Sequence, residues 1–381
     1  FAYFTQFGSG NSYGFGPNGN LVYGIRETLL GSDKLTWEKS YKTNIGLEMM
    51  LWGKLNLTLD YYWERRKDIL IQRSSLPSMA GFDASIYANM GEMDNKGVDA
   101  NLEYQTRIGN KVGLRLFGNL TYSKNKIVFR DEPAMQYAYQ KSEGTRYGEF
   151  YGYIAEGYFQ SEEEIKKSPR QMRELAPGDI KYKDLNDDGV IDANDQCYLG
   201  KSWFPSWSYG MGFNINYHNF DLALFFQGVS DVSIMANGGS IDTGNGDWGA
   251  SGVGIVPFTG MGLNPSNVIT KALDRWTADN PRADAWYPRM TANATTNDNN
   301  YVNSTHWLKD GSYLRLKQAS LGYTLENKKL MDKGIEYLYF YLSGQNLLTF
   351  SKFKLWDPEL GSNGAKYPLS RMVTLGMRVS F

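Results

Sequence analysis

Residues 207–217 read Trp-Ser-Tyr-Gly-Met-Gly-Phe-Asn-Ile-Asn-Tyr, and this stretch decides the fold because large apolar side chains occupy every second position. Small or polar residues stand at the positions between them. A period of two residues is typical of a β-strand with one apolar and one polar face. After His218 and Asn219 the alternation resumes in residues 220–226. So short a turn predicts an antiparallel hairpin.

The same alternation recurs along the chain and predicts roughly nine strands. It is found again in residues 41–51, 55–63, 98–104, 114–122, 319–325, 338–342 and 373–381. Short turns and long connections follow one another in strict order. Transmembrane β-barrels are built in this way, with short periplasmic turns and long extracellular loops. We expect the long loops at about residues 1–38, 67–96, 127–203, 228–311 and 349–367.

Charged residues of the predicted strands all fall on the polar faces. They are Asp60, Asp99, Glu103, Arg115 and Arg378. A charge at the lipid midplane would cost about 2–4 kcal/mol, so this sorting favours an all-β transmembrane antiparallel β-barrel in a bacterial outer membrane. The alternative is a soluble β-sandwich or propeller, whose strands also have one apolar face. Such strands average about five to six residues, which is shorter than the segments found here.

Composition excludes several other classes of protein. The chain has 381 residues and a net charge of −1, which argues against a nucleic-acid partner. Cys197 is the only cysteine, so there is no internal disulfide framework. No apolar run approaches 18 residues, so we expect no transmembrane helix. Because the sequence opens at Phe1 without Met or a signal peptide, we expect it to be a piece of a longer mature protein.

An acidic loop at residues 184–195 has the spacing of a calcium-binding loop. Oxygen-bearing side chains or a main-chain carbonyl stand at the ligand positions, with Gly189 at the sixth place; these ligands are Asp184, Asn186, Asp188, Val190, Asp192 and Asp195. The last position carries Asp where an EF-hand has a bidentate Glu. Calcium binding is therefore one hypothesis, and a solvated acidic turn without metal is the other. No organic cofactor is expected.

Several stretches of the sequence are distinctive in combination: Tyr13–Gly16, Leu35–Glu38, Asn95–Gly97, Pro177–Gly189, Tyr313–Lys317, Asn346–Phe350 and Asp357–Glu359, with the terminal Phe381. Together they resemble the C-terminal part of a SusC/RagA-type TonB-linked outer-membrane transporter. The resemblance spans essentially the whole chain. It implies the last nine or so strands of a 22-stranded barrel with a plugged lumen. It also implies a SusD-like surface lipoprotein lid, a dimer of transporter–lid pairs, and coupling to the TonB complex through an N-terminal part that is absent here.

The resemblance implies active import of an oligomeric nutrient, and we expect an oligosaccharide as the cargo. Aromatic rings of the long loops would stack on sugars; the candidate ligand-binding residues are Trp203, Trp248, Trp286, Trp307 and Trp356. Each of these indoles, taken singly, is also explained by packing within a loop. Peptide or siderophore import by the same type of barrel, and a passive porin, remain alternatives.

The sequence does not predict an enzyme. It has two histidines, His218 in a predicted short turn and His306 in a long loop. We expect His218 to be an exposed turn residue, and His306 has neither a Ser-Gly elbow nor a carboxylate at the spacing of a catalytic motif. Paired acids for glycoside cleavage remain an alternative, although the acidic loop is better explained as a metal site. Nucleophilic catalysis needs a base next to the nucleophile, and no such pair is marked by the sequence.

Overall fold

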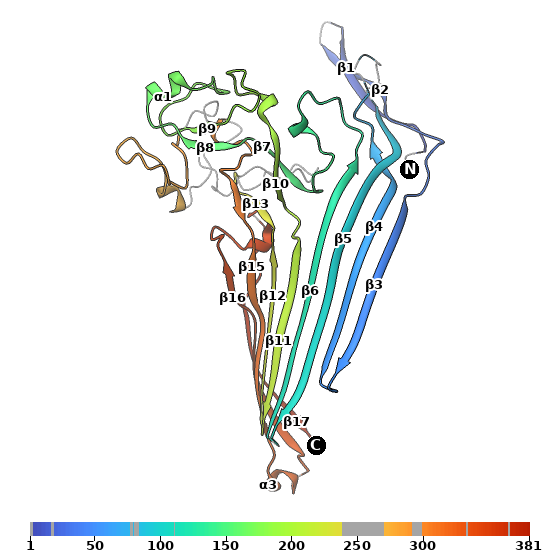
Figure 1. The fold of residues 1–381 in the computed structure, drawn as a ribbon, viewed down its shortest axis with the longest axis vertical. Coiled ribbons are helices and arrows are strands. Elements are labelled where there is room, and N and C mark those ends of the chain that lie inside the picture. Colours follow the sequence, from blue (N-terminus) through green and yellow to red (C-terminus); the bar gives the residue numbers. More distant parts are fainter. Residues whose placement is uncertain are drawn as a thin grey trace. The chain divides into compact units, whose positions relative to one another are not determined.

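A computed structural model describes residues 3–16, 19–76, 79, 84–109, 111–237, 270–291, 299–332, 334–364 and 366–381. Within them, the largest element is an 11-stranded sheet (Figure 1). Its main path runs β1-β2-β5-β6-β11-β12-β15-β16-β17, and β4 joins β3 to β5. The all-β prediction is confirmed.

Nine strands of this sheet correspond to the strands that the sequence predicted. They are β3 (Lys39–Leu51), β4 (Leu55–Gln72), β5 (Ser85–Ile108), β6 (Val112–Phe129), β11 (Trp207–Tyr217), β12 (Phe220–Ser230), β15 (Tyr313–Leu325), β16 (Tyr337–Ser351) and β17 (Met372–Ser380). The pairs from β6 to β17 are antiparallel. Strands of nine residues or more are long enough to cross a bilayer at a tilt.

Tight turns join strands where the sequence predicted them. Only His218 and Asn219 separate β11 from β12. His218 adopts a left-handed φ of 53°, and Trp52 adopts φ 52° in the turn after β3. Left-handed turn residues match the twist of the flanking strands in a two-residue hairpin loop. The predicted hairpin of β11 and β12 is therefore found, and β3 pairs with β4 across its own short turn.

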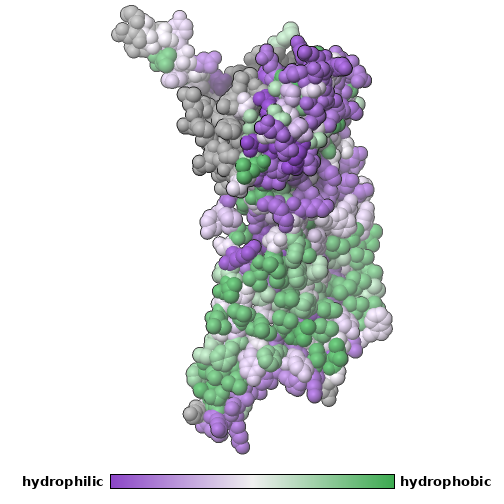
Figure 2. All heavy atoms as spheres, turned by 90° about the vertical axis from the view of Figure 1, so that its left-hand side faces the viewer, coloured by the Kyte–Doolittle hydropathy of each residue, from purple (hydrophilic) through white to green (hydrophobic). Residues whose placement is uncertain are grey.

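The two faces of the long strands carry different side chains. In β16, Leu342 lies opposite Leu321 of β15 and Leu375 of β17, whereas Ser343 on the other face lies among hydroxyl-bearing residues. Leu342 is 48% exposed and Leu375 is 81% exposed. Figure 2 shows hydrophobic residues gathered in a band over the strands, with hydrophilic residues beyond both ends of the band. An uncovered apolar band of this kind suits contact with lipid.

The long connections contain short elements of their own. Strands pair there as β7 (Glu149–Gly152) with β10 (Cys197–Ser202), β8 (Ala155–Tyr158) with β9 (Ile180–Tyr182), and β13 (Ser233–Met235) with β14 (Leu308–Asp310). The helical turns are η2 (Ala138–Gln140), α1 (Glu162–Lys167), η3 (Ala193–Asp195), η5 (Thr270–Leu273), α3 (Lys328–Met331) and η6 (Pro358–Leu360). Apart from Ile127 and Tyr313, every buried apolar side chain of the described residues lies outside the long strands.

Two of the predicted loop ranges differ from the structure. Residues 1–38 contain a hairpin of β1 (Gln6–Phe15) and β2 (Asn20–Leu30). Much of the range 67–96 is strand, because β4 continues to Gln72 and β5 begins at Ser85. The alternation of apolar residues does not continue into these extensions. It therefore predicted only residues 55–63 of β4 and residues 98–104 of β5. No helix among the described residues is long and apolar enough to cross a membrane.

Contacts divide the chain into two compact units. The first comprises Phe1–Asn44, Tyr62–Lys96 and Lys124–Tyr147, and the second comprises Ile45–Tyr61, Gly97–Ser123 and Gly148–Phe381. The folded connections described next belong to the second unit.

Candidate functional site

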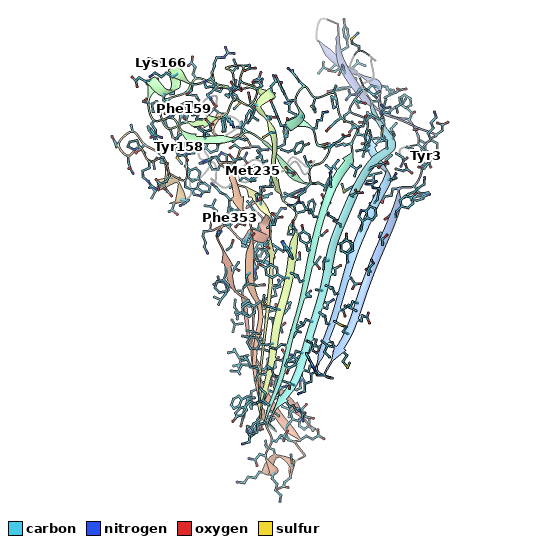
Figure 3. The ribbon with its side chains drawn as sticks, in the orientation of Figure 1. Tyr3, Tyr158, Phe159, Lys166, Met235 and Phe353 are labelled. Carbon is cyan, nitrogen blue, oxygen red and sulfur yellow. The ribbon has the colours of Figure 1, made fainter. Side chains whose placement is uncertain are left out.

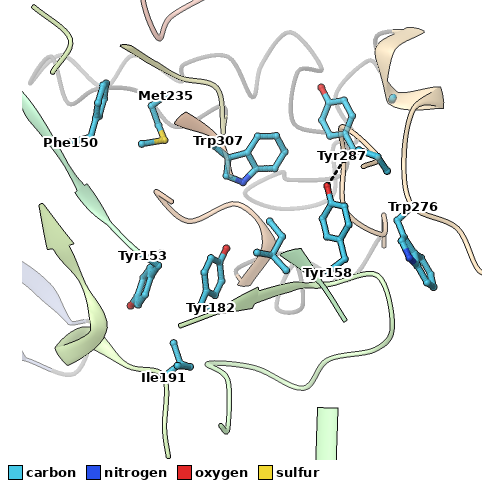
Figure 4. Packing of buried hydrophobic residues seen from close by; sticks show 12 residues of the cluster. Phe150, Tyr153, Tyr158, Tyr182, Ile191, Met235, Trp276, Tyr287 and Trp307 are labelled. Atoms are coloured by element: carbon cyan, nitrogen blue, oxygen red, sulfur yellow. Dashed lines mark hydrogen bonds between the residues drawn. The ribbon is translucent and has the colours of Figure 1, made fainter. Parts of the chain in front are cut away.

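The connections between the long strands pack around a hydrophobic cluster, called here the loop core. Its buried members are Phe150, Tyr153, Tyr158, Ile180, Tyr182, Ile191, Met235, Ala272, Trp276, Ala285, Tyr287 and Trp307 (Figure 4). Trp307 is fully buried, and its Nε1 donates a hydrogen bond of 2.7 Å to the carbonyl of Asn300. The ring of Tyr301 stacks on Trp307 with centroids 5.2 Å apart. The connections thus form a folded body, and side chains such as Tyr158 and Met235 come together from distant segments (Figure 3).

A buried carboxylate ties three segments of this body together. Asp179 has none of its surface exposed. It accepts two hydrogen bonds from Arg289, of 3.1 and 2.8 Å, one of 2.8 Å from Asn300 Nδ2, and one of 2.9 Å from the amide of Ala176. The Oδ1 atom of Asn300 in turn accepts from the amide of Ile180 at 2.9 Å. Hydrogen bonds to a charged acceptor are stronger than hydrogen bonds between neutral groups, so Asp179 contributes strongly to the stability of the loop core.

A second charged group fastens the loop after β16. Arg315 of β15 is 1% exposed and donates from Nη2 to Asp357 Oδ1 at 2.6 Å. The hydroxyl of Tyr313 donates to Glu359 Oε1 at 2.7 Å. The Asp-Pro-Glu segment noted in the sequence therefore anchors its loop on the end of β15. Both partners of this network lie in stretches that the sequence analysis had singled out, but their pairing was not predicted.

His306 is enclosed in the loop core. Its Nε2 lies 3.2 Å from the carbonyl of Trp286 and 3.3 Å from the hydroxyl of Tyr158. Burial, together with the charge of Lys309, lowers the pKa of His306 to about 3, so the ring is neutral at physiological pH. A general base works best with a pKa near the operating pH, which this imidazole does not have. His218 is exposed in its short turn, as expected. That the protein is not an enzyme stays a prediction.

The acidic loop closes on its own backbone. Asp184 Oδ2 accepts from the amide of Gly189 at 2.8 Å, while Asp184 Oδ1 is buried and has no hydrogen-bond partner. Asp195 is fully buried and accepts from the amides of Leu185 at 2.7 Å and Asp192 at 2.9 Å. Backbone amides therefore hold Asp184 and Asp195 in place, and one carboxylate oxygen of Asp184 is left unsatisfied.

The remaining predicted calcium ligands lie in the same loop. Asp188 accepts from the amide of Val190 and from Asn186 Nδ2, each at 2.9 Å. Asp192 accepts from the amide of Asn194 at 2.7 Å. Within the described residues, no three His, Cys, Asp or Glu side chains are arranged to hold a metal ion. The structure thus brings the predicted donors into one loop, with most of their oxygens directed at nearby amides.

The five candidate tryptophans lie in different surroundings. Trp307 is buried in the loop core, and Trp286 is partly buried beside it. Trp356 is partly buried against a second small cluster, formed by Ile234, Ala236 and Phe353. The ammonium of Lys309 lies 5.3 Å from the ring of Trp286. Trp203 is 41% exposed. Trp248 lies outside the described residues. A role in ligand binding stays a prediction for these residues, and Trp203 presents the most accessible ring of the four described.

Trp203 belongs to an exposed aromatic pair at the end of β10. Its ring centroid is 5.0 Å from that of Phe204, which is 44% exposed. The amide of Trp203 donates to the carbonyl of Gly148 at 3.1 Å. A Cβ on Gly148 would lie within 2 Å of the indole, and its φ of 77° also requires glycine. The backbone therefore holds the pair in a fixed position on the surface.

Sequence reasoning missed the polar partners inside the loop core. Arg289, Asn299 and Asn300 lie in a stretch rich in Asn and Thr, which has no periodicity. Asp179 is part of the quoted Pro177–Gly189 stretch, but nothing there distinguished its buried carboxylate from the exposed ones that follow. The signal available was its position ahead of Ile180 and Tyr182, which alternate as a short buried strand.

Comparisons with known proteins agree with this architecture. A family model described as TonB dependent receptor-like, beta-barrel, matches residues 2–347. TonB-dependent receptor P3 of Formosa agariphila is 28% identical over 94% of this chain and 36% of the relative. TonB-dependent receptor SusC of Bacteroides thetaiotaomicron is 23% identical over 100% of this chain and 36% of the relative. The chain thus spans about a third of the length of these curated relatives.

Solved structures share the fold. The structure of the RagAB peptide transporter has a TM-score of 0.71 at 21% identity, over 100% of this chain and 39% of that chain. The closed-closed state of the RagAB peptide importer gives a TM-score of 0.70 at 22% identity, over 100% of this chain and 39% of that chain. The strands are therefore part of an outer-membrane β-barrel, as the sequence predicted. The chain belongs to the TonB-dependent receptor family, in which it is a SusC/RagA-type member.

Proposed function

We propose that this chain is the C-terminal part of an outer-membrane transporter that imports an oligomeric nutrient with energy delivered through TonB. A SusD-like lipoprotein would cover the extracellular loops, and pairs of transporter and lid would form a dimer. The family membership and the likeness to SusC support this proposal. A lumen wide enough for an oligomer has to be closed at rest, which is the reason for a lid and an energised step.

The folded state of the long connections is the observation that carries the proposal. A passive pore does not need loops that fold around a hydrophobic core. A lid, in contrast, needs a loop surface that has the same shape each time the lid closes. The loop core and the buried Asp179–Arg289 pair supply such rigidity. The exposed Trp203 and Phe204 rings offer an aromatic surface beside it.

We propose an oligosaccharide as the cargo, because exposed indole faces stack on the C–H surfaces of sugars. Peptides or siderophores would be carried by the same type of barrel and are the alternative. Growth of the bacterium on defined glycans or on peptides, with and without the full-length gene, tests this choice. A growth defect confined to peptides would contradict the oligosaccharide proposal and leave the import proposal intact.

Energised import is tested with radiolabelled cargo in whole cells. Uptake should stop when a protonophore collapses the proton gradient, and it should stop again when TonB is deleted. A porin would continue to admit cargo in both conditions, and that result would contradict the transporter proposal.

We also propose that the 184–195 loop takes up calcium. Support comes from the ligand spacing and from the unpartnered Oδ1 of Asp184, next to an oxygen already fixed by Gly189. Elemental analysis of the full-length protein and calcium titration by calorimetry test this directly. Replacing Asp184 with Asn should abolish the binding heat, whereas Asp187→Asn, in the same loop but outside the ligand spacing, should leave it unchanged. Equal heats for both variants would contradict the proposal.

A further inference from the structure

The outward faces of β4 and β6 change from apolar to charged partway along each strand. In β4 the apolar face ends at Trp63, and the next side chains on that face are Arg65 and Lys67. In β6 the apolar face ends at Tyr122, and Lys124 and Lys126 follow on the same face. Trp and Tyr rings mark the edge of the apolar zone in membrane barrels, so the charged residues begin where the lipid head groups lie.

Ion pairs show which residues of β5 share this face. Arg65 donates to both carboxylate oxygens of Asp94, at 2.6 and 2.7 Å. Lys67 Nζ lies 3.7 Å from Glu92. Since side chains alternate along a strand, Lys96 lies on the same face as Asp94 and Glu92.

The positive charges on this face outnumber the negative ones. The outer-face basic patch, as we call it, contains Arg65, Lys67, Lys96, Lys124 and Lys126 with only Glu92 and Asp94 to balance them, a net charge of +3. Arg65 pairs with Asp94 and Lys67 lies beside Glu92, so each carboxylate already has a basic partner. Lys96, Lys124 and Lys126 are exposed. Both carboxylates are therefore already neutralised, and three exposed ammonium groups remain.

The opposite face of β4 is balanced instead. Arg66 lies on that face, where it donates to Glu64 at 2.7 Å and to Glu38 at 3.3 Å. Lys42 lies 4.0 Å from Glu64. An excess of positive charge is thus confined to the face that continues from the lipid-exposed band.

We propose that the outer-face basic patch is a docking surface for the phosphate-bearing head groups of lipids in the outer leaflet. Along each of its strands the patch is followed directly by alternating apolar residues, so a lipid whose acyl chains lie along those residues brings its head group to the lysines. A lysine or arginine near an anionic membrane surface strengthens attachment by roughly fivefold. A second copy of the protein would have to present a matching acidic surface to the patch.

The test uses the full-length protein in detergent, titrated with bis-phosphorylated lipid A and observed by native mass spectrometry. The variant Arg65→Gln/Lys124→Gln/Lys126→Gln should bind lipid A at least about tenfold more weakly than the wild type. Enzymatically dephosphorylated lipid A should bind the wild type as weakly as it binds the variant. Raising the salt concentration should weaken only the phosphorylated lipid.

The matched control is Arg66→Gln/Lys42→Gln, which removes positive charge at the same level from the opposite face. It should bind lipid A as the wild type does. Retention of the compact form in unheated electrophoresis confirms that each barrel is folded, and Lys126→Gln alone, expected to lose a few-fold, replaces the triple variant if that one does not fold. Equal binding of both lipids, equal losses in patch and control variants, or dimerisation that depends on the patch without lipid would overturn the proposal. None of these outcomes depends on the cargo.

Discussion

The loop core and the strand wall, as we call β11, β12, β15, β16 and β17 of the second compact unit, use apolar residues in opposite ways. In the loop core, Trp307 and Tyr287 have no exposed surface, and polar partners such as Asp179 are buried with them. In the wall, Leu342 and Leu375 lie opposite one another and remain exposed. The same chain therefore contains apolar residues for two different surroundings. Those of the loop core are buried by other protein side chains, whereas those of the wall remain on the surface, where lipid can cover them.

The largest effect is expected when the buried carboxylate of the loop core is removed. Asp179→Ala leaves Arg289, Asn300 and the Ala176 amide without their acceptor. Breaking a buried charge pair costs about 3–5 kcal/mol, and the partial exposure of Arg289 places the loss near 3 kcal/mol. Hydrogen exchange of residues 176–182 and 299–307 should accelerate accordingly, while exchange in β11 and β12 stays slow.

The control for that change is Glu163→Ala on the exposed helix α1. It should alter exchange in neither region. If Asp179→Ala also unfolded the wall, the two regions would be one cooperative body and the contrast drawn here would be wrong.

The loss of stability caused by a charge introduced into the wall should depend on the strand face that carries the charge. Leu342→Arg places a guanidinium on the lipid-facing side and should destabilise the barrel by about 2–4 kcal/mol. Ser343→Arg, one residue further along β16, faces water and should cost less than about 1 kcal/mol. Urea-induced unfolding in lipid vesicles, followed by tryptophan fluorescence, measures both. Equal losses would show that the faces are not separated as described.

Acid should weaken the loop core through His306. Its pKa is lowered from 6.5 to about 3, so between these values the unfolded state binds the proton more readily than the folded state. The contribution of neutral His306 to the free energy of unfolding is therefore fully present above pH 6.5. It is lost as the pH drops towards 3, and the loss reaches about 2 kcal/mol at pH 5. Exchange rates of residues 299–310, corrected for pH, should rise between pH 7 and 5, and His306→Gln should reduce this rise. A rise of unchanged size in the variant would assign the effect to another group.

The smallest effect is expected in the short turn between β11 and β12. His218 pays about 1 kcal/mol for its left-handed φ, which glycine adopts freely. His218→Gly should therefore change the stability of the wall by less than about 1 kcal/mol and leave the loop core unaffected. The same unfolding assay measures it, and a large loss would mean that the imidazole has a structural role in the turn.

The wall was predictable from the sequence because alternation is a local signal. Residues 207–217 reveal their two faces without reference to any other part of the chain, and the observed register of β11 with β12 follows from the two-residue turn. Where the strands leave the apolar zone, as in β4 beyond Trp63, both faces become charged and the signal ends. The predicted loop 67–96 began there for that reason.

The loop core could not be predicted because its contacts join distant residues. Asp179 meets Asn300 across 121 positions, and no local pattern marks either partner. The calcium prediction lies between these cases, since the spacing of Asp184 to Asp195 is local but the presence of an ion is not a property of the spacing. The same holds for Trp307, whose place in the core depends on segments that the sequence alone does not bring together.

The alternation of faces along β11 is the central claim, and site-directed spin labelling tests it most directly. Single cysteines at positions 207–217 of the full-length protein, with Cys197 replaced by Ser, would be labelled and reconstituted in lipid vesicles. Labels at Met211, Phe213 and Ile215 should be reached by oxygen dissolved in the bilayer, and those at Gly212 and Asn214 by a water-soluble nickel reagent. Accessibility without this two-residue period, or with the same reagent reaching both sets, would contradict the account.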